Sequence, residues 1–365
     1  MLVRCLQRAV GGGTVQLAPD RPGFLSIGRS PRILAARNCC ACQAGHIMSP
    51  TFRSTVVVGA GAVGSFFGAM LARAGHRVTL IGRAAHVQAI TSRGLQLHKG
   101  GQVETVAMAA TTELAALRDA DLVLFCVKST DTEAVAQQIA PWLSAHAVVL
   151  SLQNGVENAQ TLARHLPQTV VPVVVYVATA MPEPGVVKHF GRGDLVIGPL
   201  NAAAAASATV QQHLQAVVDL FATAQVPVRL SAEVMGELWL KLVVNCAYNA
   251  ISGLSQQAYG PMAALPVIHT LMQAVVREVV AVAQAAGQAL SRDDALAATD
   301  RIAVAMPGQL SSTAQDMARG KPSEIDHLNG FIARRGAELG VATPVNQTLH
   351  ALVKLVEAGR AGGPA

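Results

Sequence analysis

Apolar runs and helical patterns alternate along the first part of the chain. Residues 55–58 and 122–127 are continuous β-branched or apolar runs, typical of strands buried on both faces of a sheet. Residues 84–92 and 131–140 have the pattern of helices, and Pro141 ends the second of them. Strands that alternate with helices at this spacing predict a parallel, doubly wound sheet.

The pattern changes beyond these elements. Three short strand-like runs, at 170–179, 186–189 and 195–198, predict an antiparallel edge of the same sheet. The Ala-rich residues 202–224 predict a single helix.

From Val226 to Leu355 the apolar positions keep a 3.6-residue period, which predicts almost continuous helix. We therefore predict an α/β fold with a boundary near Ser231. An N-terminal Rossmann-type doubly wound sheet occupies residues 53–230, and an all-α C-terminal domain, expected to bind substrate and carry the chemistry, occupies residues 231–357.

A glycine-rich turn, GAGAVG at residues 59–64, joins the first strand to the first helix. Gly59 permits the tight turn, Gly61 lets the backbone approach a pyrophosphate, and Gly64 lets the helix pack on the sheet. The helix begins at Ala62 and Val63, where free amides and a partial positive charge face the phosphates. Because the chain returns to a strand about 20 residues later, the motif predicts a dinucleotide site.

An arginine, Arg83, ends the second strand. An NAD enzyme would place Asp or Glu at this position to hold the ribose 2′-OH. A guanidinium instead suits a 2′-phosphate, so the sequence predicts NADP as the cofactor.

Two further polar residues follow predicted strands, Lys128 after the strand at 122–127 and Asn154 after the strand at 147–152. Ligands of such sheets bind beyond the carboxyl ends of the strands, which places both residues beside cofactor or substrate. The alternative is that Asn154 belongs to a turn chosen for its backbone geometry and that Lys128 is a solvated strand end.

Three polar residues share one face of an otherwise apolar predicted helix: Lys241, Asn245 and Asn249, at spacing i, i+4, i+8. Such a stripe is costly unless it has partners, either another protein segment or a small polar ligand. A partly desolvated lysine has a lowered pKa and can protonate the carbonyl oxygen during a hydride transfer to a ketone.

A second polar cluster lies within residues 311–330. Ser312 and Glu324 could face the stripe, where a carboxylate would orient Lys241 and a hydroxyl would bind substrate oxygens. Asp316 is interpreted as part of a surface helix pair of little energetic weight.

The formal net charge of +6 lies mostly outside the predicted domains. Residues 1–50 contain six Arg and one Asp, which accounts for +5 and leaves the other 315 residues nearly neutral. No nucleic-acid surface is therefore expected. Since no run reaches ~18 uninterrupted apolar residues, no membrane span is expected either.

Residues 1–50 show no sustained period. Their Arg-rich, acid-poor composition fits a transit peptide. We favour a disordered leader, or an extension upstream of the true start, with the folded protein beginning near Met48. Cys39, Cys40 and Cys42 lack the spaced partner pair of a zinc site, so no metal is expected.

Only Cys126 and Cys246 lie in the body of the chain, both within apolar segments. They are expected to be buried small hydrophobes rather than catalytic thiols or disulfides, which favours a cytoplasmic protein. The sequence leaves open whether the chain forms a homodimer.

In combination these motifs resemble those of the ketopantoate reductases (2-dehydropantoate 2-reductases), over about residues 53–357. The resemblance rests on GAGAVGS at 59–65, Arg83, VKS at 127–129, QNG at 153–155, ELWLKLVVN-x-x-x-N at 237–249, SS-x-x-QD at 311–316 and EID-x-x-NG at 324–330. It implies a Rossmann domain followed by an all-α domain, with the active site in the cleft between them.

The resemblance also implies a role for each matched residue. Lys241 would be the general acid and Glu324 its carboxylate partner, which also helps to hold the substrate. The positioning residues would be Asn154, Asn245, Asn249 and Ser312, while Arg83 would bind the 2′-phosphate, Lys128 would lie near the nicotinamide, and Asn154 and Glu324 would also contact the cofactor. The implied reaction is the reduction of 2-dehydropantoate to pantoate by NADPH, on the route to pantothenate and coenzyme A.

One departure bears on the substrate. Tyr259 takes the place of a further Asn that some members of this family carry after the Lys-Asn-Asn helix, and residues 182–193 look like a subfamily variant. One alternative is therefore a paralogous NADP-dependent reductase of another small 2-keto or hydroxy acid. A non-catalytic NADP-binding protein is the other, although Lys241 and Glu324 both favour an enzyme.

Overall fold

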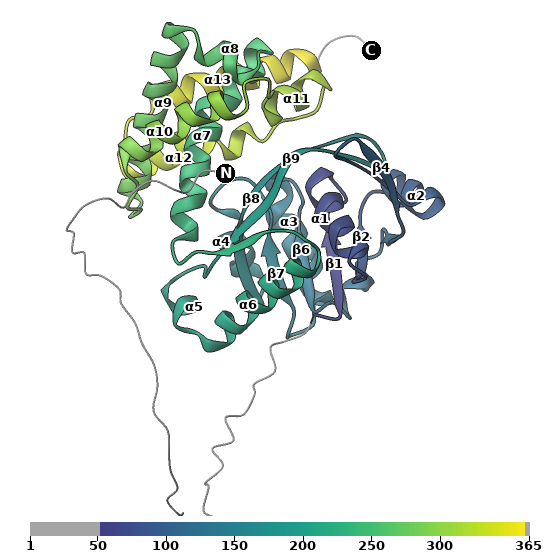
Figure 1. Ribbon diagram of the computed structural model, residues 1–365. Helices are drawn as coiled ribbons and strands as arrows, with labels where there is room; N and C mark the ends of the chain where they lie inside the picture. Colours follow the sequence, from purple (N-terminus) through teal and green to yellow (C-terminus); the bar gives the residue numbers. More distant parts are fainter. Residues whose placement is uncertain (1–51, 362–365) are drawn as a thin grey trace, which may run out of the picture. The chain divides into compact units, whose positions relative to one another are not determined.

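The computed structural model describes residues 52–361 (Figure 1). The expectations for residues 1–50, including the start near Met48, lie outside the described residues. The expected division of the body near Ser231 stays a prediction, since the described residues form a single unit.

Ten strands of the described range form one mixed sheet, in the order β4-β3-β9-β8-β7-β6-β1-β2-β5, with β10 paired to β9. Their bounds are β1 Ser54–Val58, β2 Arg77–Ile81, β3 Leu95–Lys99, β4 Gln102–Val106, β5 Ala109–Thr111, β6 Leu122–Phe125, β7 Val148–Ser151, β8 Thr169–Glu183, β9 Val186–Ile197 and β10 Val228–Leu230. From β8 to β5 every neighbouring pair is parallel. The predicted parallel core of the sheet is thus present.

This parallel sheet is covered on both faces. Val57 of β1 packs in a core with α1 (Ala62–Arg73) and α6 (Ala208–Thr223). Its neighbours on the strand pack in a core with α3 (Thr132–Ile139) and α4 (Asn158–His165) on the other face. Alternate side chains of β6 and β7 divide in the same way. A strand buried on both faces must be apolar at every position, which explains the continuous apolar runs in the sequence.

The segment beyond residue 170 differs from the prediction. Instead of short edge strands, β8 and β9 are long strands in the middle of the sheet order; β8 pairs parallel with β7 near its start and antiparallel with β9 further on. Pro172 and the glycines of β9 interrupt the strand-like pattern of the sequence, so the pattern predicted several short strands. A continuous strand can nevertheless contain proline near its start and glycine at a bulge.

The Ala-rich segment is two helices rather than the single one expected. They are α5 (Ala202–Ala206) and α6, separated by Ser207. The Ser207 side chain accepts a hydrogen bond from the Val210 amide, so it caps a new helix. A serine cap can start a helix inside an alanine-rich run that composition alone would read as continuous.

The helices that follow β10 are almost unbroken, as the periodicity predicted. Among the described residues α2 is Ala84–Arg93, and the helices after β10 are α7 Val234–Ser255, α8 Tyr259–Ala263, α9 Pro266–Ala285, α10 Arg292–Ala305, α11 Ser312–Ala318, α12 Asn329–Leu339 and α13 Pro344–Ala361. Single 3₁₀ turns of the described range lie at Leu114–Leu117, Ser129–Asp131, Ala140–Trp142 and Ile325–His327. The predicted fold class, a Rossmann-type sheet followed by a helical region, is confirmed.

A third hydrophobic core joins α7 and α9 to the other C-terminal helices. Among the described helices, only α9 has the length and composition of a membrane span. Its Val275, Val276 and Val279 are fully buried in this helical core, as in the central helix of a globular protein.

Candidate active site

The three glycines of the turn after β1 meet three different surroundings. Gly59 has a φ of +106°, and a Cβ there would lie 2.8 Å from the Cys126 backbone. A Cβ on Gly64 would lie 2.3 Å from the Gly59 carbonyl oxygen, so α1 can pack here only without a side chain. Gly61 faces open space, with nothing within 4 Å of its Cβ position.

This geometry fits a bound pyrophosphate. Open space at Gly61 lies where α1 begins, and the first-turn amides of Ala62, Val63 and Gly64 have no intrahelical acceptor. A side chain at Gly61 would fill the space that a phosphate needs. All five predicted residues of the loop therefore lie at one helix N-terminus.

Arg83 lies at the same edge of the sheet as this loop. It follows β2, which pairs in parallel with β1, and it is the N-terminal flanking residue of α2. Its side chain is exposed and takes part in none of the ion pairs among residues 52–361. Burial, and then the charges of Arg83 and Lys321, lower the pKa of His86, so a second cation lies near Arg83. A cationic, unpaired surface of this kind suits a 2′-phosphate.

Lys128 and Asn154, at the ends of β6 and β7, both contact the C-terminal helical region. The Lys128 ammonium lies 2.8 Å from an Asp316 carboxylate oxygen and donates to the Pro322 carbonyl at 2.9 Å. The sequence suggested that Asp316 pairs with a neighbouring residue of its own helix. In the structure Asp316 instead pairs with Lys128. The sequence could not show this pairing because 188 residues separate the two side chains.

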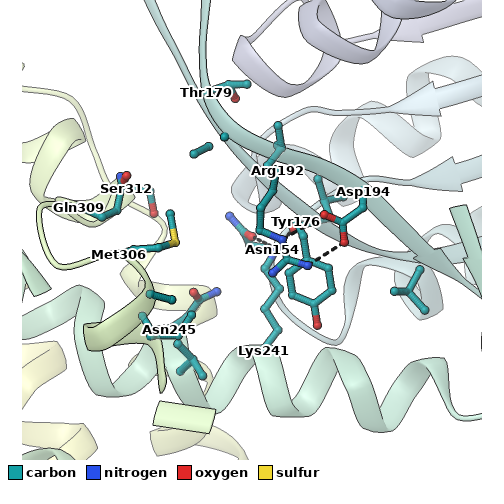
Figure 2. Close-up of a pocket in the computed structure, with 18 of the residues that line it drawn as sticks. Asn154, Tyr176, Thr179, Arg192, Asp194, Lys241, Asn245, Met306, Gln309 and Ser312 are labelled. Carbon is teal, nitrogen blue, oxygen red and sulfur yellow. Dashed lines mark hydrogen bonds and ion pairs between the residues drawn. The ribbon is translucent and has the colours of Figure 1, made fainter. Parts of the chain in front are cut away.

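The stripe on α7 points into a cavity, with Lys241 nearest the sheet (Figure 2). The Lys241 ammonium donates to Asn154 Oδ1 at 3.0 Å and to the Val175 carbonyl of β8 at 2.6 Å. One turn apart along the same face, Asn245 lines the cavity and Asn249 donates to Ser312 Oγ at 3.4 Å. The structure thus brings these predicted site residues together.

Glu324 reaches Lys241 through Asn154. Its Oε1 accepts from the Ser129 amide at 2.9 Å, and its Oε2 accepts from Asn154 Nδ2 at 3.4 Å. Asn154 therefore lies between the carboxylate and the ammonium, with its two amide atoms bonded to one each. The sequence had no signal for this intermediate position.

Burial lowers the pKa of Lys241 to about 8, because the apolar surroundings disfavour the charged amine. The Glu324 carboxylate raises this pKa, and the Arg192 guanidinium lowers it. A lysine with a pKa near neutral pH can give up and regain a proton within a catalytic cycle, as a general acid must.

The cavity has a volume of about 830 Å³ and is lined by both polar and apolar side chains. Its polar lining includes the α7 stripe, Asn154 and Ser312, together with Tyr176, Arg192 and Asp194 from β8 and β9 (Figure 2). Its apolar lining includes Leu240, Val244, Ala298, Ile302, Ala305, Met306 and Leu310, with the polar side chains of Tyr259, Arg301 and Gln309 among them. No role was predicted for Tyr176 or Asp194, and Arg192 was noted only within the variant segment at residues 182–193; the two glycines that flank Arg192 were the available signal.

The two cysteines of the body were predicted to be neither catalytic thiols nor disulfides. Cys126 and Cys246 are both free, and burial raises the pKa of each thiol. A thiol with a raised pKa is a poor nucleophile. Within residues 52–361, no group of three His, Cys, Asp or Glu side chains is arranged to hold a metal ion.

Two family models match the chain. The model described as "Ketopantoate reductase PanE/ApbA" matches residues 55–202, and "Ketopantoate reductase PanE/ApbA C terminal" matches residues 233–357.

Curated relatives match along nearly their whole length. A 2-dehydropantoate 2-reductase of Vibrio cholerae is 33% identical over 308 residues, covering 83% of this chain and 97% of the relative. One from Halobacterium salinarum is 32% identical over 305 residues, covering 83% and 98% respectively.

Two solved structures share the fold. A PanE/ApbA family ketopantoate reductase from Ralstonia eutropha JMP134 is 51% identical, with a TM-score of 0.78, covering 84% of this chain and 99% of that one. A D-mandelate dehydrogenase solved with NADH and anilino(oxo)acetate has the same TM-score of 0.78 at 25% identity, over 84% and 99% of the two chains.

Proposed function

The chain belongs to the ketopantoate reductase family of NADP-dependent oxidoreductases, and we propose that it reduces 2-dehydropantoate to pantoate with NADPH. The predicted family, enzyme class and NADP cofactor are confirmed at the level of this membership. The proposal concerns the substrate, its place in pantothenate synthesis, and the roles of the individual residues.

One observation carries the proposal: a half-buried lysine amine lines the cavity and is held by Asn154 and the Val175 carbonyl. When bound, NADPH supplies a hydride to the keto carbon. Lys241 gives its proton to the keto oxygen, so that the ketone, with the hydride at carbon and the proton at oxygen, becomes a secondary alcohol. The amine left behind regains a proton from solvent before the next turnover.

The remaining site residues hold the substrate and the acid. Asn154 fixes the Lys241 ammonium and passes the influence of Glu324 to it. Asn249 and Ser312, joined at 3.4 Å, offer donors and acceptors to substrate oxygens at the far end of the stripe. Lys128 and the loop at Gly61 lie on the cofactor side, at the carboxyl ends of the strands.

The apolar lining residues of the cavity support a second candidate, reduction of a 2-keto acid with a larger apolar side chain. Ile302, Met306 and Leu310 offer no hydrogen bond to the hydroxyl group of ketopantoate and could pack against an apolar side chain instead. The D-mandelate dehydrogenase neighbour acts, by its name, on an aromatic hydroxy acid.

We also propose that the enzyme acts in the cytoplasm. The two free cysteines of the described residues agree with this, because disulfides are rare in cytosolic proteins.

A substrate comparison tests the proposal. The purified full chain, assayed by NADPH absorbance, is expected to have its highest kcat/KM with 2-dehydropantoate among small 2-keto acids. Phenylglyoxylate, the keto form of mandelate, is the matched competitor. A higher kcat/KM with phenylglyoxylate would reject ketopantoate in favour of the second candidate, and turnover of neither would reject both.

Replacing Arg83 with alanine is expected to remove the preference for NADPH. Loss of a charge-assisted contact to a phosphate costs ~1.5–3 kcal/mol, so KM for NADPH should rise ~10- to 100-fold while KM for NADH changes little. Arg93→Ala is the matched control, because Arg93 ends the same helix and binds the Pro184 carbonyl at 3.0 Å. Equal changes in both KM values would show that Arg83 does not read the 2′-phosphate.

A further inference from the structure

Arg192 has a backbone conformation that only glycine adopts freely. Its φ is +55°, in the left-handed region, and it lies between Gly191 and Gly193 in β9. A side chain in this region costs free energy, and residues held there gather at functional sites. A third glycine would relieve this strain, so the arginine side chain needs a reason to be present.

A β-bulge turns Arg192 toward the cavity. Asp194 pairs with Tyr176 and Arg192 pairs with Val177, so Gly193 is an extra residue on β9. The bulge interrupts the regular alternation of side chains, and the contacts of Arg192 with Asp194 and Tyr176 show that the three side chains lie on one side of the strands (Figure 2).

Two contacts fix the guanidinium in this place. It lies 4.0 Å from the centroid of the Tyr176 ring, stacked as a cation–π pair. Its Nε and Nη2 donate to the two carboxylate oxygens of Asp194, at 3.0 and 2.7 Å. The side chain is thus held in one orientation before any ligand binds, which lowers the entropy lost on binding.

The tethered guanidinium keeps donors for a ligand. Of its five N–H groups, Asp194 uses one on Nε and one on Nη2, and no residue within 52–361 accepts from Nη1. The side chain is 49% exposed and lines the cavity, so this free edge is open to it. A planar edge of N–H groups matches a carboxylate.

Lys241 lies on the same side of the cavity. Its ammonium is 6.0 Å from the centroid of the Tyr176 ring over which Arg192 is stacked, so the two cations share one aromatic neighbour. In a 2-keto acid the carboxylate carbon is bonded directly to the keto carbon. A proton donor at the keto oxygen therefore needs a carboxylate ligand close beside it.

We propose that Arg192 binds the substrate carboxylate and sets the keto oxygen against Lys241. This inference rests on the proposed function and deepens it, because it selects substrates with a carboxylate next to the ketone. It also fixes the orientation: the remainder of the substrate extends away from β9, toward Asn249 and Ser312.

A cycle of substrate and enzyme changes tests this. The full-length enzyme and Arg192→Gln are assayed with NADPH and a 2-keto acid, and again with the methyl ester of that acid, which lacks the charge. The wild type should lose ~10- to 100-fold in kcat/KM with the ester, and the variant less than ~3-fold. Arg118→Gln is the control, since Arg118 is also stacked on an aromatic ring, Trp142, but lies outside the cavity. Equal losses in wild type and Arg192→Gln would overturn the inference.

A binding measurement separates this inference from the proposed function. Oxamate, an unreactive mimic of a 2-keto acid, is titrated into the NADPH-loaded protein, and its Kd should rise ~10- to 100-fold in Arg192→Gln while the Kd of NADPH stays the same. If the wild type reduces no 2-keto acid, the proposed function fails, and the oxamate titration still decides the role of Arg192. An unchanged oxamate Kd, or no oxamate binding by the wild type, would overturn it.

Arg192→Gly excludes a purely structural explanation. Glycine adopts the left-handed backbone without strain, so this variant should unfold at the same or a higher temperature than the wild type. It should nevertheless lose oxamate affinity as strongly as Arg192→Gln. Retained affinity in Arg192→Gly would show that the side chain does not bind the carboxylate.

Discussion

Replacing Lys241 with alanine lowers kcat for keto-acid reduction by ~10²-fold or more, because the keto oxygen then has no proton donor. The affinity for NADPH should change little, since Lys241 bonds to Asn154 and Val175 and not to the glycine loop. Steady-state kinetics at saturating substrate, together with NADPH binding, measure both effects.

A control separates loss of the proton donor from loss of structure. Lys241→Ala leaves the Asn154 and Val175 oxygens without their donor, so thermal unfolding must be compared as well. Lys188→Ala changes an exposed lysine of β9 and should keep full activity. A Lys241→Ala protein that is folded and retains its kcat would rule out this residue as the acid.

The same residue sets an expected pH dependence. Reduction needs protonated Lys241, and burial lowers the pKa of this amine to about 8. The protonated form prevails below this pKa, so kcat should be high there and fall by about tenfold per pH unit above it. Because the Glu324 carboxylate raises the pKa of Lys241, Glu324→Gln should move this fall to lower pH. Removing the Arg192 charge should move it to higher pH.

Alanine at Gly64 should lower the stability of the protein, whereas alanine at Gly61 should weaken the binding of NADPH. A Cβ at Gly64 would lie 2.3 Å from the Gly59 carbonyl oxygen and 2.8 Å from Val57 Cγ1, and both are held in the sheet. Gly64→Ala should therefore destabilise the folded state by about 3 kcal/mol and lower Tm by several degrees. Gly61→Ala meets open space, so it should leave Tm unchanged and raise KM for NADPH about tenfold or more.

Gly236→Ala is the matched control for this pair. Gly236 lies in α7 with nothing within 4 Å of its Cβ position, so alanine should raise the helix stability slightly. Thermal unfolding without cofactor and KM for NADPH distinguish the three variants. A Gly61→Ala protein with a normal KM for NADPH would contradict the proposal that the NADPH phosphates bind at the start of α1.

Local spacing explains why much of this site could be predicted. The glycine loop lies within six residues, and Lys241, Asn245 and Asn249 lie on one helix face whatever that helix packs against. Contacts between distant segments were the difficult part. The placement of Asn154 between Lys241 and Glu324 depends on how three separate elements pack, and no periodicity in the sequence encodes that.

Irregular backbone explains the features that were missed. The β8–β9 pairing shifts register at Tyr176, and sequence patterns of period two fail at such bulges. Arg192 consequently received no role of its own and was noted only as part of the variant segment at residues 182–193. In the same way, Ser207 divided a helix that its alanine content had made continuous.

The β8–β9 ribbon separates the evolution of substrate choice from that of cofactor choice. Arg192, Tyr176 and Asp194 come from this ribbon, whereas the glycines that we propose to face the phosphates lie at the junction of β1 and α1. Gain or loss of a single residue beside Gly193 would turn Arg192 to the opposite face of its strand, because side chains alternate along it. A lineage could thus exchange one acid substrate for another by one small insertion or deletion, while its dinucleotide-binding half stays unaltered.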